Sequence, residues 1–156
     1  MSSFSAWGPT DDGRVKPDVM GNGWLLMSTY GQDPYFAAAL GTSMAAPNVT
    51  GSLGLLQEHY ENVNGNGQFM RAATLKGLAI HTADETGDAP GPDYQYGWGL
   101  LNTRKAAGMI TAAGGDSEQI IEATLQPGAT NTVSIEVPDS DAVLKVTLVW
   151  TDPAGT

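Results

Sequence analysis

The stretch GTSMAAPNVTG, residues 41–51, decides how this sequence is interpreted, because it places one hydroxyl at the start of a helical pattern. Small and apolar residues surround Ser43 in this stretch. One interpretation is that Thr42 or Ser43 caps the helix with its side-chain oxygen. The other is that Ser43 is a nucleophile, because an unpaired amide and the helix dipole at this position stabilise an oxyanion.

From Met44 onward the sequence predicts a long helix. Four apolar residues recur at intervals of four, three and four, and so share one helical face: Val49, Leu53, Leu56 and Tyr60. Pro47 fits a helix that begins here, because a proline in the first turn breaks no internal hydrogen bond. Gly51 and Gly54 lower helix propensity, so we expect something to pack closely against them. The pattern therefore predicts a central, buried helix.

The neighbouring segments predict short strands and loops before residue 42 and two further helices up to about residue 110. Residues 24–30, WLLMSTY, are typical of a short buried strand that leads towards Ser43. Residues 68–79 and 100–110 have helical periodicity, and Asn102 is a candidate cap for the second of these helices. The long stretch between them, 81–99, is rich in glycine, proline and aspartate and is predicted to be irregular.

After residue 113 the pattern changes to that of β-strands. Residues 119–125, 131–137 and 142–150 contain many β-branched residues, and turn-forming residues separate them. Alternation puts Val133, Ile135 and Val137 on one face and Leu144, Val146, Leu148 and Trp150 on another. We expect the opening of an antiparallel β-domain. About three strands are too few to close a sandwich or barrel, so we expect the domain to be truncated.

Composition excludes several classes of function. Seventeen acidic and seven basic residues give a net charge of −10, which argues against nucleic acid or an anionic membrane as a partner. There is no cysteine, and this excludes disulfides and thiolate chemistry. The first residues have neither the positive charge nor the apolar run of a signal peptide. No apolar run approaches the roughly 20 residues that span a bilayer.

The 41–51 stretch closely resembles the nucleophile motif of the subtilisin-like serine proteases, the subtilases. The family pattern is Gly-Thr-Ser-Met-Ala-x-Pro-x-Val-x-Gly, and eight residues match it: Gly41, Thr42, Ser43, Met44, Ala45, Pro47, Val49 and Gly51. Asn48 departs from the histidine of many members at a non-catalytic position. Residues 4–23 and 82–106 resemble the segments that flank the nucleophile in the family, although only Gly23 remains of the usual Ala-Pro-Gly.

The resemblance implies an α/β fold and a protease activity. Residues 1–113 are expected to form the C-terminal part of a subtilisin-like parallel-sheet domain. Residues 114–156 resemble the start of the β-sandwich or jelly-roll domain of some secreted subtilases. Ser43 is then the nucleophile, with its N–H in the oxyanion hole, and Thr42 and Gly41 line the substrate cleft. The parent protein is expected to be an extracellular endopeptidase that hydrolyses peptide bonds through an acyl-enzyme and requires no cofactor.

The resemblance also implies that the catalytic base is missing. The family's Asp, His and oxyanion-hole Asn precede the nucleophile, and no matching motif precedes Ser43 here. His59 lies 16 residues further along the same helix, about 24 Å away, and His81 occupies a position that the family uses for packing. We therefore expect the chain alone to be inactive and to need the missing N-terminal half. A non-catalytic remnant that binds peptides or proteins is the alternative, and a structural role for the β-region is the third.

Four acidic residues in the irregular stretch form a candidate calcium site: Asp84, Glu85, Asp88 and Asp93. Carboxylate oxygens on a flexible loop suit calcium, and many subtilases bind this ion. The spacing is not that of an EF-hand, and a loop of this charge is often simply solvated. Calcium is thus expected at most as a structural ion.

Overall fold

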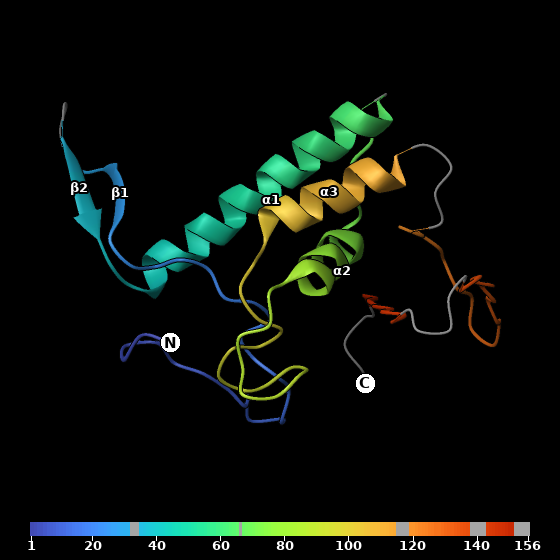
Figure 1. The fold of residues 1–156 in the computed structure, drawn as a ribbon, viewed down its shortest axis with the longest axis horizontal. Helices are drawn as coiled ribbons and strands as arrows, with labels where there is room; N and C mark the ends of the chain where they lie inside the picture. Colours follow the sequence, from blue (N-terminus) through green and yellow to red (C-terminus); the bar gives the residue numbers. More distant parts are fainter. Residues whose placement is uncertain (32–34, 66, 115–118, 138–142, 152–156) are drawn as a thin grey trace.

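The computed structural model of the chain describes residues 1–31, 35–65, 67–114, 119–137 and 143–151. Its regular elements are two strands, β1 (Leu26–Thr29) and β2 (Phe36–Ala39), followed by three helices, α1 (Thr42–Asn64), α2 (Ala72–Thr82) and α3 (Thr103–Ala113). In Figure 1 the hairpin stands at the N-terminal end of α1, while α2 and α3 lie along the C-terminal half of α1. None of the described helices is long and apolar enough to span a membrane.

Strands β1 and β2 form an antiparallel hairpin, in which Leu26 pairs with Ala39 and Thr29 with Phe36. The sequence predicted a strand here correctly, but its predicted burial is wrong. The side chains of Met27 and Phe36 are 68% and 67% exposed. The reason is that two strands alone bury neither face, and no other described element forms a layer against them.

Helix α1 is longer than its neighbours and is far more exposed than its pattern predicted. Leu56 is its only buried residue, and an added Cβ at Gly51 or Gly54 meets no atom within 4 Å. The predicted face exists, since Leu53, Tyr60 and Leu56 all contact the core. The rest of the helix has no covering layer among the described residues. The expectation of a central, buried helix with close packing at its glycines is therefore not met in this chain.

The core lies where the three helices meet. Its buried side chains come from α1, from the connection to α2, and from α2 and α3: Leu56, Met70, Leu78, Ala106 and Ile110. The side-chain amide of Gln57 donates to the carbonyl of Met70 at 3.0 Å and accepts from its amide at 2.9 Å. Gln57 thus occupies both backbone polar groups of Met70, and the next residue, Arg71, is extended. Helix α2 begins at Ala72, four residues later than predicted.

Helix α3 begins at Thr103, three residues later than predicted, and the predicted cap Asn102 is confirmed. The Asn102 side chain accepts a hydrogen bond from the Lys105 amide at 2.9 Å. Just before this cap, Leu100 forms a parallel bridge with Met20 and an antiparallel bridge with Asp84. This is the one parallel pairing among the described residues, so a parallel sheet is not confirmed in this chain.

The segment after α3 contains no strand in residues 119–137 or 143–151. It lies instead beside α2 and is held by side chains (Figure 1). Glu122 pairs with Arg71 at 3.1 Å, and Val149 approaches Gly77. Both predicted apolar faces are exposed, as the exposed fractions of Ile135 (52%) and Leu148 (79%) illustrate. The expected antiparallel β-domain is thus not formed within these residues, because their backbones have no strand partner.

Candidate functional site

Ser43 lies in the first turn of α1, and its side chain is exposed. The N-cap of the helix is Gly41, and no side chain caps the helix. The interpretation of Thr42 or Ser43 as a capping residue is therefore not supported by the geometry. Gly41 has a φ of 147°, a conformation that residues with a Cβ rarely adopt, and this explains the glycine at the start of the motif.

The backbone amides of this turn differ in whether they have partners. The amides of Met44 and Ala45 donate to the carbonyl of Gly41, at 3.0 and 3.2 Å. The Ser43 amide donates to no acceptor among the described residues. It lies at the positive end of the helix dipole, beside an exposed hydroxyl. This combination favours a negatively charged oxygen next to Ser43.

Pro47 lies in the second turn of α1 rather than the first, because the helix begins at Thr42. A proline at this position has no amide hydrogen to donate to the carbonyl four residues earlier, which belongs to Ser43. The expectation that Pro47 removes no internal hydrogen bond is therefore wrong by one turn. Its consequence is local: the carbonyl of Ser43 lacks its usual helical donor.

Two glycines of the preceding loop pack directly against the turn that carries Ser43. The Gly41 amide donates to the Gly23 carbonyl at 2.8 Å. A Cβ at Gly23 would lie 2.5 Å from the Gly41 carbonyl oxygen, and one at Gly21 would lie 2.5 Å from a methyl carbon of Val49. Only glycine permits this approach. The sequence 20–23 thus positions the turn, although it departs from the Ala-Pro-Gly of the family pattern.

An aromatic pair supports the same loop from the N-terminal side. The rings of Phe4 and Trp24 are stacked, with centroids 6.3 Å apart. Between this pair and β1, Leu25 has a φ of 50°, an uncommon conformation for a residue with a large side chain. Neither feature is evident from the sequence, because the two rings are twenty residues apart.

Neither histidine ring forms a hydrogen bond with Ser43. The His59 ring forms a hydrogen bond with the Thr111 hydroxyl at 2.9 Å and so joins α1 to α3. The His81 ring forms one with the Thr147 hydroxyl, also at 2.9 Å, and joins α2 to the C-terminal segment. Partial burial lowers the pKa of His81 below its usual value of 6.5, and the nearby charge of Lys145 lowers it further. Both rings are structural links.

Three of the four acidic residues of the candidate calcium loop already have partners. Asp84 pairs with Lys105 and accepts from the Asn102 amide at 2.8 Å, and these hydrogen bonds lower its pKa. Glu85 accepts from the backbone amides of Gly87, Gly91 and Thr86, which lower its pKa in the same way. Asp93 accepts from two amides of the turn that follows it.

Asp88 makes no hydrogen bond or ion pair with a described residue. Among the described residues, no group of three or more acidic or histidine side chains is arranged to hold a metal ion.

Comparison with known proteins decides the family. A sequence model of the subtilase family, peptidase family S8, matches residues 1–99, which is more than half of the chain. The chain belongs to the subtilase family.

Individual relatives agree with this assignment. A serine protease/ABC transporter B family protein, tagA of Dictyostelium discoideum, is 29% identical over 99% of this chain. The C5a peptidase of Streptococcus pyogenes serotype M18 is 48% identical over 61 residues, or 39% of the chain. The PII-type proteinase of Lactococcus lactis subsp. cremoris is 31% identical over 70% of the chain. Among solved structures, the CspB protease of Clostridium perfringens matches 66% of the chain with a TM-score of 0.56 and 27% identity.

This subtilase chain spans only a small part of the length of each relative. It covers 10% of the tagA protein, 5% of the C5a peptidase and 6% of the PII-type proteinase. It covers 22% of the CspB protease chain. The similarity therefore supports a protease relationship for the part of the fold that carries residues 41–51.

The geometry also explains two glycines of the subtilase-like segment 82–106, in the sequence Tyr-Gly-Trp-Gly at residues 96–99. Both glycines have positive φ, 63° at Gly97 and 109° at Gly99. A Cβ at Gly97 would lie 2.1 Å from the Pro17 carbonyl oxygen, and one at Gly99 would lie 2.1 Å from that of Asp84. Three chain segments therefore meet at this turn, and only glycine fits.

Asp18 has a structural role in the subtilase chain. Partial burial opposes its ionisation, but hydrogen bonds from Lys16 and Lys76 outweigh this effect, and the pKa of Asp18 is lowered. The Lys76 pair measures 3.1 Å and joins the loop to α2. The sequence indicated a hydrogen-bonding role for Asp18 but not these partners, because Lys76 is 58 residues away.

Proposed function

We propose that this chain is the nucleophile-bearing part of a subtilisin-like serine endopeptidase, here called the parent protease. Ser43 attacks the carbonyl carbon of a peptide bond and forms an acyl-enzyme, which water then hydrolyses. The Ser43 amide donates to the oxyanion of the tetrahedral intermediate. Gly41 and Thr42 belong to the substrate cleft. The substrate is a peptide or protein, and the chemistry of the acyl-enzyme needs no organic cofactor.

One observation carries this proposal: Ser43 has an exposed hydroxyl and an unpartnered amide in the first turn of α1, and no side chain caps the helix. A serine that merely began the helix would use its oxygen to accept a backbone amide. Here Gly41 is the cap, so the hydroxyl remains available. The subtilase family match over residues 1–99 gives the same residue its mechanistic context.

The chain alone is expected to be inactive. A general base must lie within hydrogen-bond reach of the serine, and both histidines are bound to threonine hydroxyls elsewhere. The base and the remaining oxyanion donor must therefore come from a missing N-terminal half, which we propose as the partner of this chain. The exposed length of α1, with open space at Gly51 and Gly54, is consistent with such a partner.

Two further features of the parent protease are proposed from the sequence pattern. Residues 114–156 begin a β-sandwich or jelly-roll domain whose other strands pair with 131–137 and 143–150. The exposed apolar side chains of these segments, among them Ile135 and Leu148, support this. The parent protease acts outside the cell, as the resemblance to secreted subtilases suggests, and neither nucleic acid nor membrane is proposed as a partner.

The function is tested by peptide hydrolysis. In the parent protease, Ser43→Ala is expected to lower kcat on the order of a million-fold, the loss known for the nucleophile of subtilisin itself. Ser52→Ala is the matched control, because Ser52 lies in the same helix and its hydroxyl only donates to the Asn48 carbonyl. The control should retain activity. Hydrolysis by the 156-residue chain alone that disappears in Ser43→Ala would contradict the proposed need for a partner.

Calcium is retained only as a proposed structural ion at the 84–93 loop. The partners of Asp84, Glu85 and Asp93 do not favour it, since backbone amides and a lysine already satisfy these carboxylates. Bound calcium should raise the melting temperature of the chain by mass action. A thermal melt in millimolar calcium that matches a melt in chelator would rule the site out.

A further inference from the structure

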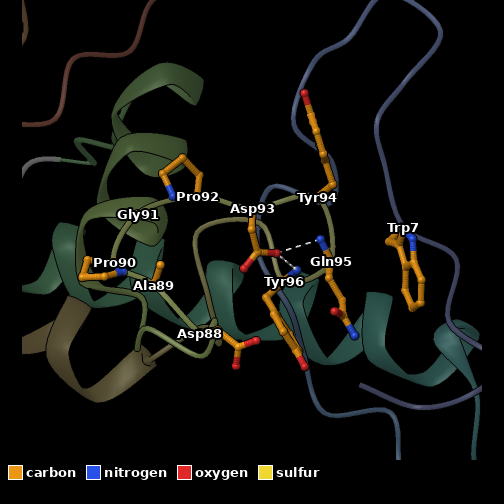
Figure 2. Close-up of a pocket in the computed structure, with 10 residues that line it drawn as sticks. All are labelled: Trp7, Asp88, Ala89, Pro90, Gly91, Pro92, Asp93, Tyr94, Gln95 and Tyr96. Atoms are coloured by element: carbon orange, nitrogen blue, oxygen red, sulfur yellow. Dashed lines mark hydrogen bonds between the residues drawn. The ribbon is translucent and has the colours of Figure 1, made fainter.

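A cavity of about 450 Å³ is lined by none of residues 41–51. Figure 2 shows the residues that line it. It lies between Trp7 and the loop 88–96. Two contacts hold these segments together: the Gly8 amide donates to the Tyr94 carbonyl at 2.9 Å, and the Tyr94 hydroxyl donates to the Gly13 carbonyl at 3.3 Å. The volume falls within the range of roughly 300 to 1,000 Å³ that is usual for ligand pockets.

The polar groups that line the cavity fall into two sets. Asp93 is occupied, because one of its oxygens accepts from the amides of Gln95 and Tyr96 at 2.7 and 2.6 Å, as Figure 2 shows. The side chains of Asp88, Gln95 and Tyr96 make no hydrogen bond or ion pair with any described residue. In Figure 2, Gln95 and Tyr96 extend to the same side of the loop, and Tyr94 extends to the opposite side. The side chains of Asp88, Gln95 and Tyr96 can therefore hydrogen-bond to a ligand.

The charge of the cavity favours a cation. Its ten lining residues include Asp88 and Asp93 but no lysine, arginine or histidine. The chain as a whole carries a net charge of −10. Trp7 and Tyr96 add aromatic rings, whose faces attract cations, and Trp7 is 57% exposed. An anionic ligand is disfavoured on every one of these grounds.

We propose that this cavity binds the guanidinium group of an arginine side chain. A guanidinium is planar, stacks on an aromatic face, and donates in a fixed fork that matches a carboxylate. Asp88 accepts two of its hydrogen bonds, the Gln95 carbonyl and Tyr96 hydroxyl oxygens accept others, and Trp7 covers the plane. The site takes arginine either within a peptide or as a free small molecule, because the recognised chemistry is the same.

The test compares arginine with its neutral isostere. The 156-residue chain is titrated with Nα-acetyl-arginine amide and Nα-acetyl-citrulline amide, and binding is followed by saturation transfer to the ligand in NMR. This readout does not require a monomeric protein. We expect the arginine compound to bind with a Kd on the order of millimolar and the citrulline compound at least about fivefold more weakly. Equal binding of the two compounds would overturn the proposal.

Three variants locate the site. Asp88→Asn removes the charge with little change of shape and should weaken arginine binding about fivefold. Trp7→Leu should weaken it about threefold through loss of the aromatic face. Glu58→Gln removes the same charge from an exposed position on α1 and should leave binding unchanged. An Asp88→Asn variant that binds like the original chain, or a Glu58→Gln variant that is weakened as much, would overturn the assignment.

A further arm separates the two sources of the guanidinium. Propylguanidine has the guanidinium as its only charged group and lacks peptide groups. Propylguanidine binding equal to that of the acetyl-arginine amide supports recognition of the cation alone, while weaker propylguanidine binding supports a peptide ligand. This site does not depend on Ser43. Ser43→Ala should therefore leave arginine binding unchanged, so the failure of either proposal leaves the other intact.

Discussion

Gly21 and Gly51 differ in how closely other atoms of the chain approach them. A Cβ at Gly21 would lie 2.5 Å from Val49 and 2.9 Å from the Ala45 carbonyl, whereas one at Gly51 meets nothing within 4 Å. We predict that Gly21→Ala destabilises the chain by about 1–3 kcal/mol through overpacking. Gly51→Ala should stabilise it by about 0.5–1 kcal/mol, because alanine favours an exposed helix interior.

Urea unfolding of both variants measures these two free energies. The opposite signs are the informative result, since a general intolerance of glycine replacement in this chain would make both variants less stable. A stabilised Gly21→Ala variant would contradict the close packing of the 20–23 loop on the turn that carries Ser43.

At this scale the sequence predicted residues whose role depends on near neighbours. Asn102 was predicted correctly as a cap from its place before a helix, whereas the role of Ser43 as nucleophile, which rests on the motif around it, stays a prediction. The two hydrogen bonds between Gln57 and Met70 were not predictable, because they join residues 13 positions apart through a particular path of the connection. The hydrogen bonds that Glu85 accepts from three backbone amides were likewise not predictable, because they depend on the shape of its loop.

Among the elements, the contact between α2 and the C-terminal segment is expected to depend on pH. His81 bonds to Thr147, and its pKa lies below the usual 6.5 in the folded chain. The unfolded chain therefore binds this proton more readily than the folded one. The contribution is fully present above about pH 6.5 and is lost as the pH falls below that value. The loss should be under about 1 kcal/mol, because solvent screens the partly exposed ring.

Urea unfolding at pH 7.5 and 5.5 measures this difference. His81→Asn should reduce the dependence on pH over this range. Thr147→Val is the control, because it removes the hydrogen-bond partner and keeps the titrating ring, so it should lower stability at both values. A His81→Asn variant whose stability changes with pH as much as the original would contradict the role given to His81.

Helix existence was more predictable than helix burial. Periodicity located all three helices, since an apolar face repeats within each segment itself. Burial depends on what packs against that face, and much of α1 has no described neighbour. The same limit applies to residues 131–137 and 143–150. Their alternation is typical of strands, but a strand forms only where another backbone accepts and donates its hydrogen bonds.

At the scale of the whole molecule, the chain has a small core and a large exposed apolar surface. Five buried side chains form the helical core, while large apolar residues of the hairpin, α1 and the C-terminal segment are exposed. Fold class depends on what packs against such surfaces, and a local sequence pattern does not contain that information. This is why the subtilase motifs identify the family, while the parallel sheet of the expected fold is not present among the described residues.

The central claim is that Ser43 is a nucleophile that needs a base from outside this chain. The most direct measurement is covalent labelling with a fluorophosphonate, with the modified residue located by mass spectrometry, in the 156-residue chain and in the parent protease. We predict an adduct on Ser43 in the parent protease, no adduct on Ser52 in the same helix, and no labelling of the chain alone. A parent protease that is labelled elsewhere, or not at all, while it hydrolyses peptides would contradict the account.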